Sequence, residues 1–127
     1  MLPHPTDAEL DILAVLWHLG PSTVRAVHQA LGKSSGYTTT LKQMQVMTEK
    51  GLLVRDDRAR SHIYRARAPK EQTRQQVAAD LLRRCFAGSA KDLLLGALAA
   101  EPASEEELAE IQRVLKDLEK NKAAGRS

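Results

Sequence analysis

Residues 38–46 carry side chains that can read the edges of DNA bases. In the segment 37–50 (YTTTLKQMQVMTEK), one helical face holds threonine, lysine, glutamine and valine instead of the usual mixture of glutamate and lysine. Such polar side chains hydrogen-bond base edges and phosphates, and small apolar groups contact the thymine methyl. The residues predicted to read bases are Thr38, Thr39, Lys42, Gln43 and Val46. The alternative for this face is an ordinary solvated surface.

A second set of residues is suited to the DNA backbone. Ser22, Thr23 and Arg25 lie where a short helix begins, and the backbone N–H groups of a helix N-terminus favour phosphate. Two more basic side chains occupy a polar turn and a histidine lies in the strand that follows it, although this hairpin could also have an ordinary charged tip. Tyr37 either donates to phosphate or packs. The predicted backbone contacts are Ser22, Thr23, Arg25, Tyr37, Arg58, Arg60 and His62.

Three helices and a hairpin must position these residues. Apolar residues recur at helical spacing, Thr6 and Glu9 form a capping box, and Gly20 and Gly51 terminate helices. Alternation around a polar turn predicts two strands. The expected elements are helices over 6–19, 23–31 and 37–50, a loop over 32–36, and strands over 52–55 and 61–66. This order is typical of a winged helix-turn-helix, in which the third helix lies in the major groove and the hairpin is the wing.

The remaining sequence predicts three thin helices, over 70–86, 89–99 and 104–120, with a second capping box at Ser104 and Glu107. They are too small to enclose a core, so their leucine stripes predict pairing with a second copy in a twofold dimer. The predicted interface residues are Val77, Leu81, Leu82, Phe86, Leu94, Leu98, Leu108, Ile111, Leu115 and Leu118. The expected fold is therefore mainly α: a winged-helix domain (1–68), a helical dimerisation domain (69–121) and a disordered tail (122–127).

Composition and charge support a small nucleic-acid-binding protein. The chain has 127 residues and a net charge of +3, but residues 20–68 hold nine Lys or Arg against three Asp or Glu. A basic excess on one segment is the electrostatic footprint of a nucleic-acid site, and the alternative is a solvated surface that happens to be basic. No apolar run is long enough to span a bilayer and no signal peptide is recognisable, so a cytoplasmic protein is expected.

Catalytic and metal chemistry is not expected. The single cysteine, Cys85, excludes an internal disulfide and a cysteine-rich zinc site, and it is predicted to be buried on the apolar face of its helix. The four histidines lack metal-ligand spacing, and no phosphate loop or paired-carboxylate site is present, so neither a cofactor nor an enzyme is predicted. The alternatives left open are a winged-helix module for protein interaction and a regulator that senses a small ligand in its helical half.

The run GYTTTLKQMQVMTEKGLL (36–53), with RSHIYRA at 60–66, resembles the BlaI/MecI/CopY family of bacterial transcriptional repressors. The segments 6–31 and 88–99 fit the same family, and Ser35 stands where its motif begins with Thr. The resemblance implies a homodimeric repressor that binds a palindromic operator with its winged helices and dimerises through its C-terminal helices.

The resemblance also implies how such repressors are released. In the penicillinase and methicillin repressors, a membrane-bound sensor peptidase signals antibiotic stress and the repressor is cleaved at an Asn-Phe pair in its dimerisation domain. The matching positions here are Gly96 and Ala97, so this chain lacks the Asn-Phe pair at which those repressors are cleaved. The copper-responsive branch carries C-terminal Cys-x-Cys pairs, which this chain lacks.

Overall fold

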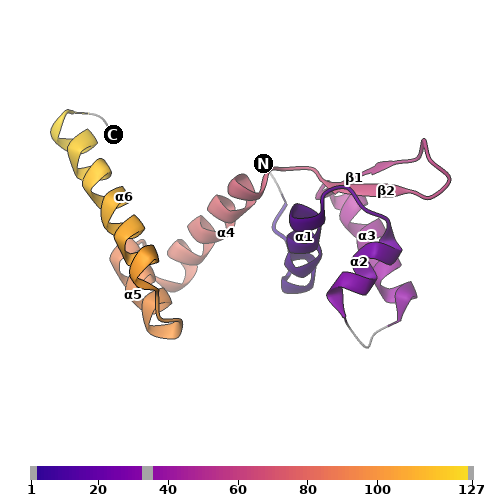
Figure 1. The fold of residues 1–127 in the computed structure, drawn as a ribbon, viewed down its shortest axis with the longest axis horizontal. Coiled ribbons are helices and arrows are strands. Elements are labelled where there is room, and N and C mark those ends of the chain that lie inside the picture. Colours follow the sequence, from indigo (N-terminus) through magenta and orange to yellow (C-terminus); the bar gives the residue numbers. More distant parts are fainter. Residues whose placement is uncertain (1–2, 33–35, 126–127) are drawn as a thin grey trace. The chain divides into compact units, whose positions relative to one another are not determined.

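The chain folds into helices and one antiparallel hairpin, in a computed structural model that describes residues 3–32 and 36–125 (Figure 1). The elements in order are α1 (Asp7–Leu19), α2 (Val24–Leu31), α3 (Tyr37–Lys50), β1 (Leu53–Asp56), β2 (Ile63–Ala66), α4 (Lys70–Cys85), α5 (Ala90–Ala100) and α6 (Glu105–Ala123). This order confirms the expected winged helix followed by a helical segment. Most of the expected loop over 32–36, including Ser35, lies outside the described residues.

Two element boundaries differ by two residues or more from the sequence-based expectation, and several others differ by one. The second strand begins at Ile63, two residues later than expected, because residues 57–62 form the open end of the hairpin. The last helix continues to Ala123 instead of ending near Lys120, so the expected tail is helical over its first two residues. The end of that tail, residues 126–127, lies outside the described residues.

Two compact units divide the chain, Met1–Asp80 and Leu81–Ser127, referred to below as the N-terminal unit and the C-terminal unit. The expected boundary was at residue 68. The N-terminal unit extends further because the first turns of α4 pack on it, where Thr73 is only 5% exposed. Helix α4 therefore begins in one unit and ends in the other.

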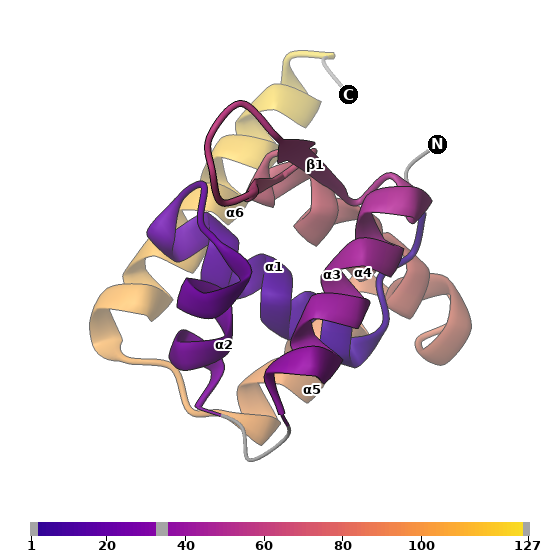
Figure 2. The same cartoon turned by 90° about the vertical axis from the view of Figure 1, so that its right-hand side faces the viewer.

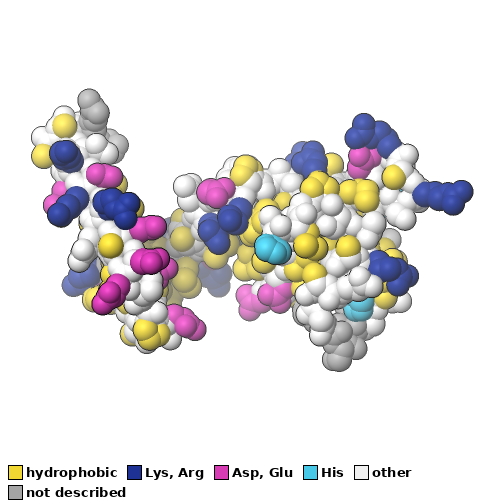
Figure 3. Space-filling view, viewed as in Figure 1, with side chains coloured by type: hydrophobic (Ala, Val, Ile, Leu, Met, Phe, Trp, Pro, Cys, Tyr) yellow, Lys and Arg dark blue, Asp and Glu magenta, His cyan; other side chains and the backbone are white. Residues whose placement is uncertain are grey.

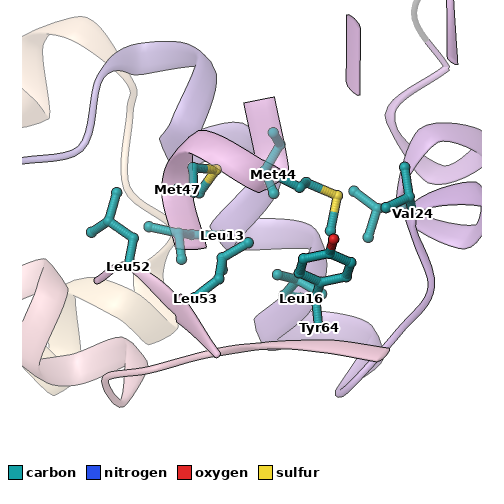
Figure 4. Packing of buried hydrophobic residues seen from close by; sticks show 10 residues of the cluster. Leu13, Leu16, Val24, Met44, Met47, Leu52, Leu53 and Tyr64 are labelled. Carbon is teal, nitrogen blue, oxygen red and sulfur yellow. The ribbon is translucent and has the colours of Figure 1, made fainter. Parts of the chain in front are cut away.

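The core of the N-terminal unit lies where the three helices meet the hairpin (Figure 4). Helix α1 contacts α2, α3 and β2, and Figure 2 shows it between α2 and α3. The buried apolar side chains come from every element of the winged helix: Ile12, Leu13, Leu16, Val24, Val27, Met44, Met47, Leu52, Leu53 and Tyr64. This core fixes the orientation of α3, because the helix can turn only one face inward.

The hairpin is attached to the helices by backbone hydrogen bonds and by a tight helix end. Tyr64 pairs with Arg55 across the hairpin, and its backbone also exchanges hydrogen bonds of 2.9 and 2.8 Å with Ser22. Gly51 ends α3 with a φ of 88°, a conformation that favours glycine. The Leu52 amide then donates to the Met47 carbonyl at 2.9 Å, and β1 begins.

The C-terminal unit contains α5, α6 and the end of α4. Ser89 and Ser104 cap α5 and α6 by accepting hydrogen bonds from the amides of Asp92 and Glu107, as expected at helix N-termini. None of its described residues is buried. Over the described part of the whole chain, no helix is both long and apolar enough to cross a membrane.

Candidate nucleic-acid interface

The exposed face of α3 is formed by the residues predicted to read bases. Thr40, Met44 and Met47 point into the core, and their burial turns the opposite face outward. On that outward face Thr38, Thr39, Lys42 and Val46 are exposed and Gln43 is half-buried. Val46 leaves 41% of its surface in solvent although it is apolar. The structure thus brings all five residues together on one accessible face, as a base-reading role requires.

This face continues on both sides into shallow surface grooves. On one side, the five residues line a groove together with Thr6, which caps α1, and Glu9 of α1. On the other side, Gln45, Thr48 and Glu49 of α3 line a groove with the hairpin, opposite Arg55, Asp57 and Arg67. Gln45 and Glu49 were not selected from the sequence as base-reading residues. They lie three and seven residues after Lys42, and this helical spacing places them on a neighbouring part of the same surface, which was the signal that could have identified them.

An ion pair between Glu9 and Lys50 connects the start of α1 to the end of α3. Lys50 Nζ lies 2.8 Å from both carboxylate oxygens of Glu9, and the Thr6 amide donates to the same carboxylate at 2.9 Å. Burial alone would raise the pKa of Glu9. This effect is outweighed by the hydrogen bonds from Lys50 and Thr6 and by the positive charge of Lys50, so the pKa of Glu9 is below its ordinary value. This contact holds α3 in place beside α1.

Tyr37, at the first turn of α3, is held by two side chains of α2. The Arg25 guanidinium lies 5.1 Å from the centre of the Tyr37 ring, and the His28 ring meets it edge-on at 6.1 Å. His28 Nδ1 is itself 2.8 Å from Thr40 Oγ1. Since Tyr37 remains 39% exposed, packing and phosphate contact are compatible for this residue.

Ser22 and Thr23 have structural roles within the chain. Ser22 is buried and donates its hydroxyl to the Gly20 carbonyl at 2.8 Å, while Thr23 caps α2 by accepting from the Ala26 amide at 3.1 Å. Of the three residues predicted to contact phosphate near this helix start, Arg25 is the exposed one.

The three wing residues predicted from the sequence, Arg58, Arg60 and His62, are all exposed. Figure 3 shows Lys and Arg side chains gathered at the end of the hairpin. Arg58 lies 2.8 Å from Asp56, and His62 Nδ1 lies 2.8 Å from Asp57. Two further exposed arginines, Arg65 in β2 and Arg67 just after it, extend the basic surface and were not selected from the sequence. Their position at the end of the predicted second strand and just after it was the available signal.

The residues predicted to form a dimer interface stay exposed or half-buried in the single chain. The large apolar side chains exposed from α4 to α6 are Leu81, Leu95, Leu108, Val114, Leu115 and Leu118, at 41–58% of their surface. Leu95 and Val114 were not selected from the sequence because they lie at the edges of the predicted leucine stripes. Gly96 and Ala97, the positions matching the family's cleavage site, are exposed within α5.

One prediction about this unit is wrong. Cys85 was expected to be buried, but it is exposed, because nothing in the C-terminal unit of a single chain covers that face of α4. Among the described residues, no three His, Cys, Asp or Glu side chains gather in a way that could hold a metal ion.

Comparison with known proteins finds similarity over nearly the whole chain. A family model described as penicillinase repressor matches residues 5–117. A penicillinase repressor from Bacillus licheniformis is 23% identical over 118 residues, which cover 91% of this chain and 92% of the relative.

Proposed function

The chain belongs to the penicillinase repressor family, whose members are transcriptional repressors and not enzymes, and from this premise we propose that it is a homodimer that binds a palindromic operator. The observation that carries the proposal is the outward face of α3, where threonine, lysine, glutamine and valine side chains stand exposed on a helix fixed by a buried core. A recognition helix in the major groove needs such a face.

The residues that read bases and the residues that hold phosphates have separate roles in the interface. Thr38, Thr39, Lys42, Gln43 and Val46 read base edges, because they form the accessible centre of α3. Arg25, Tyr37 and the basic wing hold the flanking phosphates, which sets the register of the protein on the duplex.

Dimerisation uses the exposed apolar side chains of the C-terminal unit. One winged helix contacts a single half-site, and joining two of them raises the affinity through a high effective concentration. A twofold pair of winged helices matches a twofold operator.

The dependence of operator affinity on dimerisation explains how repression is relieved. Any signal that separates the two copies, such as cleavage near Gly96 and Ala97 by a membrane sensor peptidase, leaves each half-site held by one unit alone. Operator occupancy then falls without any change in the reading face of α3.

The test is a mobility-shift titration on an operator selected from a random duplex library. Lys42→Ala and Gln43→Ala should each weaken specific binding by about 1–3 kcal/mol. Lys116→Ala and Gln75→Ala, which remove the same side-chain types from exposed positions on α6 and α4, should leave it unchanged. If neither α3 variant alters operator affinity, the assigned reading face is wrong.

Salt dependence separates this function from a protein-interaction module of the same fold. Binding through phosphates releases counterions, so affinity for DNA falls steeply as salt increases. A chain that shows no salt-dependent binding to any duplex is not a DNA-binding repressor.

A further inference from the structure

The wing places carboxylates directly against its own basic side chains. Arg55 lies 2.7 Å from Asp57 through Nε, and a second guanidinium nitrogen of Arg55 donates to the same carboxylate at 3.2 Å. Arg58 donates to both oxygens of Asp56, at 3.0 and 2.8 Å, and His62 lies 2.8 Å from Asp57. Three of the four basic residues between positions 55 and 62 therefore face an acid.

Arg60 is the exception. It is exposed at the tip, and no ion-pair partner is found for it among the described residues. The charge that the wing offers to DNA is therefore much smaller than its number of basic residues suggests.

The Arg55–Asp57 and Arg58–Asp56 ion pairs lie on different faces of the hairpin. Side chains alternate along a strand, so Arg55 and Asp56, which are neighbours in β1, point to opposite faces. Arg55 and Asp57 line the groove between the hairpin and α3, together with Gln45 and Glu49. The Asp57 carboxylate thus stands beside the outward face of α3, where phosphates would pass.

Stability does not require these pairs. Ion pairs at exposed positions contribute little to folding, and Arg58 is 91% exposed. Asp56 also accepts a hydrogen bond from the Arg58 amide at 3.0 Å, a turn contact that an asparagine side chain would retain. The hydrogen bonds from Arg58 lower the pKa of Asp56 to about 2, so this carboxylate stays charged at neutral pH.

We propose that Asp56 and Asp57 compete with DNA phosphates for Arg58 and Arg55, so that these two arginines bind a duplex only by exchanging carboxylate oxygens for phosphate oxygens. This inference rests on the proposed DNA-binding function. The two acids keep the sequence-independent part of the affinity small, because that part comes almost entirely from phosphate neutralisation. Discrimination between sequences then depends on α3.

The test compares the wild-type dimer with Asp56→Asn/Asp57→Asn on a random-sequence duplex, by fluorescence anisotropy over a series of KCl concentrations. The variant should bind roughly three- to tenfold more tightly at low salt, since two arginines on each chain of the dimer become free to bind phosphate. The slope of log affinity against log salt should steepen by about 4, because each of the two wings in the dimer gains two phosphate contacts and each contact adds about 0.9 to the slope.

A charge-matched control separates this competition from a general change in net charge. Glu110→Gln/Asp117→Asn removes two acids from exposed positions of α6 and should change the affinity for the random duplex by much less. Adding Arg55→Ala/Arg58→Ala to the wing variant should abolish its gain, whereas the same two alanines in the wild type should cost little. This double-mutant cycle assigns the gain to the two arginines.

The outcomes distinguish this inference from the proposed function. Unchanged or weaker binding by a folded Asp56→Asn/Asp57→Asn variant, with normal salt-dependent binding by the wild type, overturns the inference and leaves the proposed function intact. It would mean that the acids position the arginines for phosphate. If the wild type shows no salt-dependent duplex binding, both proposals fall.

Discussion

The N-terminal unit encloses its apolar side chains within a single chain, whereas the C-terminal unit leaves its own exposed. Ile12, Val27, Met44 and Met47 have no surface in contact with solvent. In the C-terminal unit Leu115 is 45% exposed and Leu118 58% exposed, and none of its described residues is buried. Both units have helices with apolar faces, so helical periodicity alone does not explain the difference.

The difference arises from how many elements surround each apolar face. In the N-terminal unit α1 has α2 on one side, α3 on another and a strand against a third, so a core can close. The C-terminal unit has two helices and the end of a third, which is too little to cover them. We therefore expect the N-terminal unit to carry its stability within one chain and the C-terminal unit to obtain it from a second copy.

The largest effect should follow from placing a charge in the exposed apolar stripe of α6. Leu115→Glu should raise the dissociation constant of the dimer by at least a hundredfold. Burial of a leucine contributes about 1.5–3 kcal/mol, and a twofold interface loses that contribution twice. Analytical ultracentrifugation at several protein concentrations measures the change.

Ala109→Glu is the matched control for this prediction. It adds the same carboxylate to the same helix at an exposed position away from the leucine stripe, so the dimer should persist. If Leu115→Glu also remains fully dimeric, the stripe on α6 is not the interface, and the contrast between the two units has another cause.

The next largest effect should appear in the core of the N-terminal unit. Met44→Ala should lower the free energy of unfolding by about 2–5 kcal/mol, because it leaves a cavity at a fully buried position. The single tryptophan, Trp17, reports on this unit, since it lies in α1 and its ring N–H donates to the Ala68 carbonyl at 3.4 Å. Urea unfolding followed by tryptophan fluorescence therefore measures the change in this unit.

Val46→Ala provides the contrast on the same helix. Its side chain is 41% exposed, so the free energy of unfolding should change by no more than about 0.5 kcal/mol. Equal losses for Met44→Ala and Val46→Ala would contradict the assignment of an inward and an outward face to α3. The dimer should survive both substitutions.

Features that depend on neighbours in sequence were predictable. The capping box of Thr6 and Glu9, the end of α3 at Gly51 and the outward face of α3 each follow from residues within a few positions of one another. The order of elements, three helices followed by a hairpin, then predicted the winged helix.

Features that depend on distant parts of the chain were not predictable. Glu9 and Lys50 are 41 positions apart, and only the packing of α1 against α3 brings them together. Periodicity showed that Cys85 belongs to an apolar face, but it could not show whether the same chain covers that face. The ion pairs of the wing join residues only two positions apart, but they were not predicted either, since pairing of Asp57 with Arg55 and of Asp56 with Arg58 depends on side-chain geometry.

The smallest effect concerns the ion pair that secures α3 in the N-terminal unit. Lys50→Met should lower the free energy of unfolding by about 1 kcal/mol at neutral pH, because the Glu9 carboxylate loses its partner while only 9% of its side chain remains exposed. The cost stays modest because Lys50 itself is 35% exposed and partly screened by water. Lys42→Met, at an exposed position of the same helix, should cost less.

The pH dependence of this loss identifies its cause. The pKa of Glu9 is lower in the folded chain than in the unfolded chain, so the ion pair stabilises the fold fully above the ordinary carboxyl pKa. That stabilisation is lost as the pH falls through the lowered pKa of Glu9. The difference in unfolding free energy between wild type and Lys50→Met should therefore be constant near neutral pH and shrink below about pH 4.5. A difference that stays the same down to pH 2 would show that the loss does not come from the charge of Glu9, and that the ion pair is not what stabilises α3 beside α1.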